Sequence, residues 1–363
     1  FINGESFKTK KTYIRENPAT LSPLLEVSLC SKKEIDYACD TAFLAFGSWS
    51  KTPPVVRGQI LFNIASEVKA KIDLLALINT QETGKPIKES TLVELGGVVR
   101  TFEYYAGLAT KIKGDSQIIN EDLVSFTFKE PVGVVAQILP WNFPLLLAAW
   151  KIAPALAAGC SVVIKPSELT PSGTVELAKI ITDSGVPKGV VNVCPGMGEV
   201  AGDALVKNNK ISKISFTGSS EIGKTIVKNS ADKLAKVSLE LGGKAPNIIF
   251  EDANLDSCIE ANLRGGFFNQ GENCTAVTRL FVHKKIFKKF VNSYIKNISK
   301  INQDNPENQN SQMGALISDQ HFKKVKNCVA KSIKEGGKIL YQGKISKSLK
   351  GYFYPPTLVE LTD

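Results

Sequence analysis

One cysteine, Cys274, stands in a stretch whose composition suits a reactive thiol. Residues 267–279 read FFNQGENCTAVTR, so glycine and polar side chains come directly before the thiol, and a predicted strand, residues 279–283, follows it. Free cysteines are usually small buried apolar residues, whereas polar and flexible neighbours favour an exposed thiol. Because a thiolate is a soft nucleophile that adds to carbonyl carbons, Cys274 is the first candidate for covalent chemistry.

Two further residues have the types that such chemistry requires. Addition of a thiolate to a carbonyl places negative charge on oxygen, and the side-chain amide of Asn142, within PWNF, could donate a hydrogen bond to it. Glu240 lies between Leu239 and Leu241, where we expect desolvation to raise the pKa of its carboxyl group toward that of a general base. Plainer interpretations, a turn residue for Asn142 and a lysine-paired carboxylate for Glu240, stay open at this point.

The segment between residues 133 and 231 supplies the elements that would position such groups. Four times a short apolar strand is followed by a polar loop and a helix, with strands predicted at residues 133–138, 161–165, 190–193 and 213–216. Successive βα units predict a doubly wound parallel sheet of the Rossmann type, in an α/β protein, with ligands at the carboxyl ends of the strands. We therefore expect a nucleotide as ligand.

Other helices and strands surround this repeat. Ser31 is a predicted N-cap, with Glu34 three residues later, for a helix that ends near Trp49. Short apolar pieces before residue 30 predict hairpin strands outside the main sheet. Helices are also predicted at residues 55–71, 73–83, 88–109, 255–267, 284–300 and 323–334, and a strand at residues 123–128.

Composition and charge exclude several classes of protein. The 363 residues contain no apolar run near the roughly 20 residues needed to span a bilayer, so we expect no membrane partner. Seven cysteines without a C-x-x-C pair, together with two histidines, predict no metal site and suit a reducing compartment. The net charge of +10 comes from lysines spread along helices rather than clustered with aromatics, so we expect no nucleic acid partner.

Two glycine clusters allow different interpretations. Residues 218–225 read GSSEIGKT, the phosphate-loop pattern of NTPases, and the acids at residues 251–252 after an apolar strand could hold magnesium. A phosphate-loop NTPase using Gly218 to Thr225 is therefore an alternative function, although it explains nothing about Cys274. Gly196, Gly198 and Gly202 are spaced one residue wider than the dinucleotide fingerprint, so a plain βα turn is as good an interpretation as a cofactor contact.

Five motifs in order closely resemble the aldehyde dehydrogenase superfamily, in its hydrolytic NAD(P)-dependent branch. They are PWNF, KPSELTP, FTGSSEIG, LELGGKAPNI and FNQGENCTA, and they span nearly the whole chain. The resemblance implies oxidation of an aldehyde to a carboxylic acid through a cysteine hemithioacetal and a thioester, which a Glu-activated water hydrolyses. Cys274 would be the nucleophile, Asn142 with the Cys274 backbone N–H the oxyanion hole, and Glu240, 34 residues before Cys274, the base.

The resemblance also implies the cofactor and substrate contacts. NAD is the expected cofactor because a carboxylate at Glu168 would accept bonds from the ribose hydroxyls and repel a 2′-phosphate; Lys165 would soften that repulsion, so NADP stays open. Phe143 and Trp150 would line a substrate tunnel, or form plain helix core. The implied cofactor contacts are Ile138, Pro140, Trp141, Lys165, Ser167, Glu168, Gly198, Gly202, Phe216, Thr217, Gly218, Ser219, Ile222 and Leu241.

The same resemblance predicts the domain organisation. Residues 1–112 and 132–241 would form an NAD-binding domain, residues 113–131 a small bridging hairpin used in oligomerisation, and residues 242–363 a second α/β catalytic domain. That domain would be incomplete at its C-terminus, because the family's Glu-Ile-Phe-Gly-Pro motif is not in the sequence. We expect a cytoplasmic homodimer or homotetramer acting on a small-molecule aldehyde, with a non-catalytic scaffold of the same fold as the remaining alternative.

Overall fold

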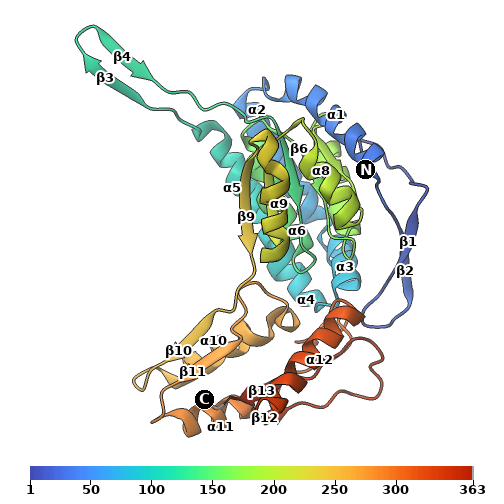
Figure 1. Ribbon diagram of the computed structural model, residues 1–363, viewed down its shortest axis with the longest axis vertical. Helices are drawn as coiled ribbons and strands as arrows, with labels where there is room; N and C mark the ends of the chain where they lie inside the picture. The colour runs from blue at the N-terminus through green and yellow to red at the C-terminus, as the bar shows by residue number, and fades with distance from the viewer. Residues whose placement is uncertain (362–363) are drawn as a thin grey trace. The chain divides into compact units, whose positions relative to one another are not determined.

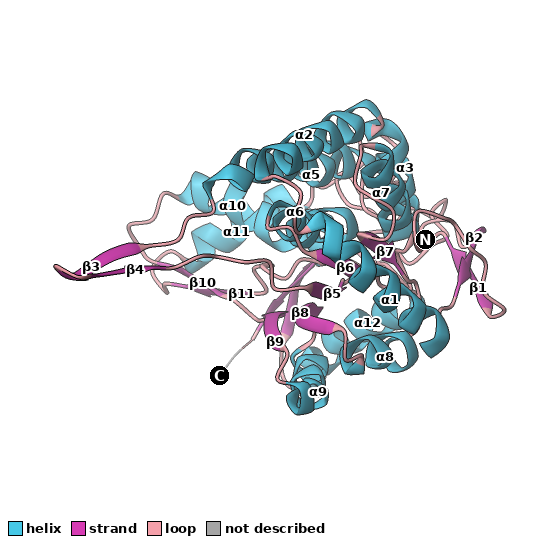
Figure 2. Cartoon of the chain, turned by 90° about the horizontal axis from the view of Figure 1, so that it is seen from above, coloured by secondary structure: helices cyan, strands magenta, loops and turns pink. Residues whose placement is uncertain are grey.

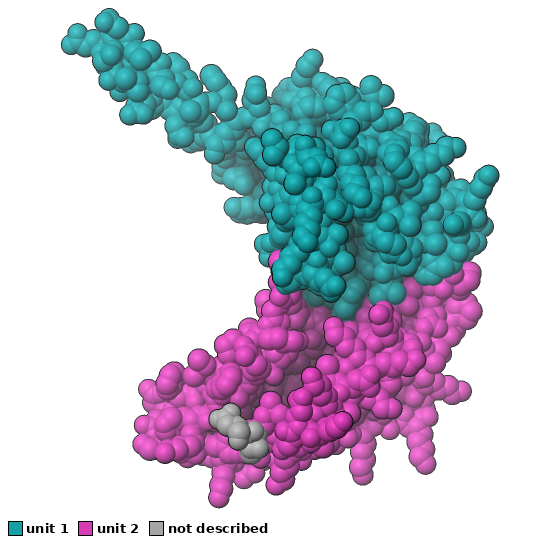
Figure 3. Space-filling model, in the orientation of Figure 1, with its two compact units in different colours: residues 1–13, 26–75, 92–240 teal, residues 14–25, 76–91, 241–363 magenta. Residues whose placement is uncertain are grey.

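A computed structural model describes residues 1–361, and contacts divide the chain into two units (Figure 3). The first unit contains residues 1–13, 26–75 and 92–240; the second contains residues 14–25, 76–91 and 241 onward. The resemblance predicts residues 14–25 and 76–91 in the cofactor domain, whereas in the structure they pack with the second unit. Main-chain hydrogen bonds explain this, since Ala315 donates its N–H to the Gly84 carbonyl and Ile87 donates its N–H to the Pro306 carbonyl. The functional labels of the two parts stay predictions.

The first unit is built on a five-stranded sheet in the order β7-β6-β5-β8-β9. Its strands are β5 (Val134–Ile138), β6 (Ser161–Lys165), β7 (Val191–Val193), β8 (Ile211–Gly218) and β9 (Lys236–Leu241). The pairs β5/β6, β6/β7 and β5/β8 are parallel, and β5 and β6 are buried throughout. The chain runs outward from β5 and then returns to β8 on the other side of it, which confirms the doubly wound sheet and places its switch point between β5 and β8.

Helices cover both faces of this sheet (Figure 2). On one face, α1 (Lys32–Trp49), α8 (Asp203–Lys207) and α9 (Ser220–Ser230) share an apolar core with β5 and β8. The other face carries α2 (Pro54–Ala70), α5 (Gly96–Leu108), α6 (Pro144–Ala157) and α7 (Ser172–Asp183). Because both faces are covered, the central strands β5 and β6 are short apolar runs that are buried throughout, which is why the sequence predicts them.

The elements before the sheet follow the predictions with one exception. Ser31 caps α1, and the carboxylate of Glu34 accepts the Ser31 backbone N–H at 2.8 Å, which confirms the capping box. After α3 (Ile72–Thr83), the helix predicted at residues 88–109 is present, but it is not uniform, because the chain forms α4 (Ile87–Glu89), a π-helical turn (Ser90–Leu95) and then α5. Such a turn inserts a residue into the helical path and is frequent at functional sites.

Two hairpins lie outside the main sheet. The strands β1 (Thr12–Glu16) and β2 (Pro23–Ser28) form a two-stranded sheet, which confirms the prediction for the start of the chain. An antiparallel hairpin of β3 (Ser116–Asn120) and β4 (Leu123–Phe126) extends away from the rest of the first unit (Figure 1). Every residue of β3 and β4 is exposed, although five of these nine side chains are large and apolar: Ile118, Ile119, Leu123, Val124 and Phe126.

The second unit has its own α/β core. The strand β10 (Pro246–Ile249) is parallel to β11 (Arg279–Val282), and both pack with α10 (Leu255–Phe267) and α11 (Phe287–Ile298) around a buried apolar cluster. Farther along the chain are α12 (Asp319–Lys334) and the antiparallel pair β12 (Lys338–Gln342) and β13 (Thr357–Glu360). No helix among residues 1–361 is long and apolar enough to cross a membrane.

Candidate active site

Cys274 follows a turn in which three consecutive residues have left-handed backbone. The helix α10 ends at Phe267, and φ is 51° at Asn269, 55° at Gln270 and 79° at Gly271. Positive φ is uncommon outside glycine, and at Asn269 and Gln270 it costs of order 1–3 kcal/mol each, which the surrounding contacts must offset. The side chain of Cys274 is exposed, which confirms that the thiol is presented rather than packed in the core.

Two carboxyl groups anchor this turn, and sequence reasoning missed both. Glu89 Oε2 accepts the backbone N–H of Asn269 at 3.0 Å. Glu272 is 5% exposed; its Oε1 accepts the backbone N–H of Ile317 at 3.0 Å, and its Oε2 accepts the side-chain amide of Gln270 at 3.2 Å. The one signal for Glu272 in the sequence is an acidic residue two positions before a candidate nucleophile.

Cationic and neutral groups surround the Glu272 carboxyl group. Burial raises its pKa to about 8, against the hydrogen bonds from Ile317 and Gln270 and the charges of Lys85 and Arg15, which lower it. The Nε2 atom of His321 lies 3.5 Å from Glu272 Oε1, but burial lowers the pKa of that imidazole to about 4. His321 is therefore neutral near pH 7, and the charges beside Glu272 come from Lys85 and Arg15.

Asn142 lies in the loop between β5 and α6, which is where the sequence placed it. Its Oδ1 accepts the backbone N–H of Phe143 at 3.1 Å, so the other end of the amide is the donor group that an oxyanion needs. The helix that follows is fixed by Glu94, a fully buried residue of the π-helical turn, whose Oε1 accepts the N–H groups of Leu145 at 2.9 Å and Leu146 at 3.3 Å. A carboxylate at a helix N-terminus is favourable, so Glu94 stabilises the start of α6.

Glu240 lies near the end of β9 and is exposed, so the expected desolvation between Leu239 and Leu241 is wrong. The physical reason is that β9 is the edge strand of the sheet, so one side of it has no partner strand among the described residues. Lys151 of α6 is a nearby cation, influenced by the charge of Glu240, that sequence reasoning missed. Burial lowers its pKa to about 8, the charge of Glu240 opposes that change, and its Nζ donates to Ser215 Oγ at 2.7 Å.

Most implied cofactor residues gather at the carboxyl edge of the sheet. Ile138 pairs in register with Lys165 of β6 and with Phe216 of β8, so three of them are direct neighbours. The loops after β5 and β6 carry Pro140, Trp141, Ser167 and Glu168; β8 ends at Thr217 and Gly218; Gly198 and Gly202 bound a π-helical turn; Ser219 and Ile222 start α9; and Leu241 ends β9. The sheet thus brings most of these residues together, with Leu241 on the edge strand.

The phosphate-loop interpretation of residues 218–225 is wrong. The helix α9 already begins at Ser220, with Ser219 as N-cap, so Gly223, Lys224 and Thr225 lie within the helix. The N–H of Gly223 donates to the Ser219 carbonyl at 2.9 Å, and Lys224 and Thr225 are exposed. A phosphate loop needs free backbone N–H groups ahead of the helix, and helical bonding removes them here.

The polar groups at this edge fit a dinucleotide. Lys165 is 4% exposed, and its Nζ donates to the Pro166 carbonyl at 2.8 Å and lies 3.5 Å from Glu168 Oε2. Burial lowers the pKa of that amine. Thr217 Oγ1 is buried without a hydrogen-bond partner among the described residues, and the capped N-terminus of α9 follows it. A carboxylate can accept hydrogen bonds from a ribose diol, and a helix N-terminus favours a pyrophosphate. The types of these residues therefore fit a dinucleotide.

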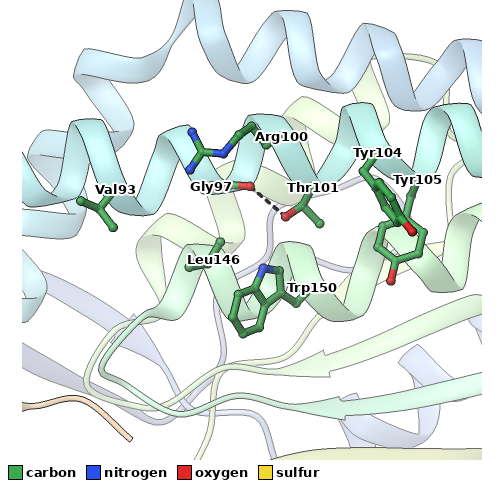
Figure 4. A pocket seen from close by; sticks show the side chains of 8 residues that line it. All are labelled: Val93, Gly97, Arg100, Thr101, Tyr104, Tyr105, Leu146 and Trp150. Atoms are coloured by element: carbon green, nitrogen blue, oxygen red, sulfur yellow. Dashed lines mark hydrogen bonds between the residues drawn. The ribbon is translucent and has the colours of Figure 1, made fainter. Parts of the chain in front are cut away.

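A cavity of about 730 Å³ lies between α5 and α6 (Figure 4). This volume is in the range of small-molecule sites. Trp150 lines the cavity, whereas Phe143 is buried at 9% exposure and is not among the lining residues; the tunnel role of both stays a prediction. The lining residues are Val93, Gly97, Arg100, Thr101, Tyr104, Tyr105, Leu146 and Trp150.

The candidate residues divide between the units: Asn142 and Glu240 belong to the first, and Cys274 belongs to the second. Within residues 1–361, no group of three or more histidine, cysteine, aspartate or glutamate side chains could hold a metal ion.

The family model described as "Aldehyde dehydrogenase family" matches residues 5–363. An aldehyde dehydrogenase of Vibrio cholerae is 39% identical over 99% of this chain and 73% of its own length, and retinal dehydrogenase 2 of Homo sapiens is 41% identical over 99% and 70%. A solved NAD+ complex of aldehyde dehydrogenase from Bacillus cereus matches with a TM-score of 0.96 at 38% identity, covering 99% of this chain and 74% of that one. The chain thus spans 70–74% of the length of these three proteins.

Proposed function

Since the chain belongs to the aldehyde dehydrogenase family, we propose that Cys274 is the nucleophile of its reaction, with Asn142 as oxyanion donor and Glu240 as general base. The reaction is the NAD(P)-dependent oxidation of an aldehyde to a carboxylic acid. The observation that carries the assignment is the exposed thiol of Cys274 behind a left-handed turn anchored by Glu89 and Glu272.

The first half of the mechanism converts the aldehyde carbon to a tetrahedral centre from which hydride can leave. The Cys274 thiolate attacks the aldehyde carbon and forms a tetrahedral hemithioacetal, whose oxygen takes the negative charge. The side-chain amide of Asn142 and the backbone N–H of Cys274 donate to that oxygen; a donor of this kind contributes about 3 to 4 kcal/mol in other enzymes. Bound NAD supplies the hydride acceptor.

The second half frees the cysteine. The carbon that has lost hydride is a thioester of Cys274, and Glu240 takes a proton from the water that attacks it. The exposed position of Glu240 suits contact with water. Collapse of the tetrahedral adduct breaks the carbon–sulfur bond, which releases the carboxylic acid and restores the thiolate.

NAD is proposed as the preferred form of the cofactor. The partly exposed carboxylate of Glu168, 3.5 Å from Lys165 Nζ, would accept hydrogen bonds from a ribose diol. A 2′-phosphate in the same place would meet a like charge, a repulsion of about 4 kcal/mol per pair at intermediate dielectric before solvent screening. Lys165 would offset part of it, so NADP would serve as a weaker cofactor.

A homodimer or homotetramer is proposed from the β3–β4 hairpin. Its exposed apolar side chains include Ile118 at 76% and Phe126 at 64% exposure. Contiguous exposed apolar surface marks contacts with other protein, and an isolated hairpin is marginally stable in water. The cytoplasm is the proposed location, because all seven cysteines are free thiols, as is usual in a reducing compartment.

Production of NADH from a panel of aldehydes tests the function. The wild type should turn over, and Cys274→Ala should lose activity while it still shows a thermal shift with NAD. Cys328→Ala is the matched control, because Cys328 is also exposed but lies on α12. Unchanged turnover of Cys274→Ala would exclude this mechanism, and a wild type with neither turnover nor an NAD-dependent thermal shift would favour the non-catalytic scaffold.

A further inference from the structure

We propose that Glu272 is a positioning residue for Cys274. The buried carboxyl group of Glu272 holds the left-handed turn of residues 269–271 to the segment at Ile317. The inference rests on the proposed role of Cys274 as nucleophile. Glu272 touches no reacting atom in this proposal, and it acts on the thiol through the backbone of the turn.

The main chain of Glu272 closes the turn. Its backbone N–H donates to the Asn269 carbonyl at 2.8 Å, and its carbonyl accepts the Asn269 side-chain amide at 2.9 Å. Asn269 is therefore held in left-handed backbone by contacts made with a residue just two positions before Cys274. Non-glycine residues keep such backbone only where the surroundings over-determine it.

The side chain of Glu272 joins this turn to a segment 45 residues away in sequence. One carboxyl oxygen accepts the N–H of Ile317, and the other accepts the amide of Gln270, a residue of the turn itself. One side chain thus bridges the turn and a buried segment of the same unit. Both ends of the bridge are buried, so water does not replace it readily.

The segment that Glu272 binds is itself fixed. Arg15 is buried and donates from one guanidinium nitrogen to the carbonyls of Ile317 at 2.9 Å and Glu82 at 2.8 Å. Ala315 donates its N–H to the Gly84 carbonyl at 3.0 Å, where a Cβ on Gly84 would lie 2.4 Å from the Ala315 oxygen. Because this segment is fixed, it should not shift to compensate when the carboxyl group of Glu272 is removed, so the turn itself should move.

Loss of the bridge should move the thiol without unfolding the unit. Cys274 is exposed, so its place is set by the backbone of the turn and not by packing around its own side chain. A misplacement of about 1 Å in an active site costs about 100-fold in rate. Glu272→Ala removes both acceptor oxygens, whereas Glu272→Gln keeps one for the Ile317 N–H and replaces the other with NH2.

The test measures thiol position and turnover separately. Iodoacetamide labelling, resolved by peptide mass spectrometry, gives the rate of alkylation of Cys274, with the exposed Cys328 as reference in the same sample. Steady-state kinetics give kcat and the KM for NAD, and thermal melting gives Tm. Glu260→Gln is the matched control, because Glu260 is an exposed acid on α10, the helix that leads into the turn.

For Glu272→Ala we expect kcat to fall about 100-fold. The ratio of Cys274 to Cys328 labelling should change by about tenfold or more, while the KM for NAD stays within about twofold. Glu272→Gln should recover most of both losses. If Glu272→Ala has the same kcat and the same labelling ratio as Glu260→Gln, the proposal is overturned. It is also overturned if the Ala and Gln variants lose kcat, NAD binding and Tm together, which indicates a general structural role. Labelling requires no turnover, so it remains informative even if Cys274→Ala shows that the proposed function is wrong.

Discussion

At the carboxyl end of β6, the buried Nζ of Lys165 lies 3.5 Å from Glu168 Oε2, so a cation and an anion share one strand end. The carboxylate is the more exposed member of the pair and faces water, while the amine is 4% exposed and donates to the Pro166 carbonyl. A ligand that enters from solvent therefore meets the negative member first, which is the basis of the proposed preference for NAD.

Neutralising that carboxylate should shift cofactor use. In Glu168→Gln, kcat/KM for NADP relative to NAD should rise by about tenfold, since a partly exposed pair realises only part of the repulsion expected at intermediate dielectric. Initial rates with each cofactor at one aldehyde concentration measure the ratio. Glu176→Gln on α7 is the control, and an unchanged ratio in Glu168→Gln would rule out this role of the carboxylate.

Removal of the proposed base should separate the two halves of the reaction. Glu240→Gln should still form the thioester, so stopped-flow mixing should show a burst of about one NADH per active site. Steady-state kcat should fall by about 10²-fold or more, because water is no longer activated. A variant that turns over at the wild-type rate, or that loses the burst as well, would contradict the assignment of Glu240 to hydrolysis.

Stability should depend on pH through Glu272. Burial raises the pKa of its carboxyl group from 4.5 to about 8, so between these values the folded state keeps a proton that the unfolded chain releases. The resulting stability is fully present below pH 4.5 and is lost as pH rises through about 8. His321, whose pKa is lowered to about 4, has the opposite effect only below about 6.5.

The free energy of unfolding of the wild type should therefore fall between pH 6.5 and 8 more steeply than that of Glu272→Gln. Urea denaturation across this window measures both slopes. Parallel curves for the two proteins would show that Glu272 does not titrate there.

Charges on the β3–β4 hairpin should disrupt the proposed oligomer. Ile118 and Val124 are register partners, and Phe126 lies on the same face two residues from Val124. Val124→Lys with Phe126→Lys should give monomers, because two buried charges would oppose an apolar contact. Light scattering after size exclusion measures the mass. Ser125→Lys on the opposite face is the control, and an unchanged mass in the double variant would place the interface elsewhere.

Local chemistry explains which features could be predicted from the sequence. The apolar runs of β5 and β6 and the Ser31–Glu34 capping box involve residues adjacent in the chain, and both predictions are confirmed. The exposure of Glu240 depends on the place of β9 at the sheet edge, which its flanking leucines do not reveal. The bond between Glu272 and Ile317 joins segments 45 residues apart, so no local pattern announces it.

The phosphate-loop pattern shows that a sequence motif can be present without the backbone structure that it predicts. GSSEIGKT satisfies the motif letter by letter, yet Ser219 caps a helix that begins at Ser220 and takes the later motif residues into helical bonding. A serine at the second motif position is a good N-cap, and this local preference decided the backbone. The π-helical turn that buries Glu94 is likewise invisible in the apolar spacing of residues 88–109.

The exposed position of Cys274 also makes this thiol a site of oxidative damage. In the proposed mechanism the turn offers the Cys274 sulfur to an aldehyde, and the same exposure offers it to hydrogen peroxide, which converts a thiolate first to sulfenic acid and then, irreversibly, to sulfinic and sulfonic acids. Four of the other cysteines, Cys30, Cys39, Cys160 and Cys194, are buried and protected. Oxidative damage should therefore begin at the surface thiols, and loss of the proposed nucleophile should precede loss of the fold.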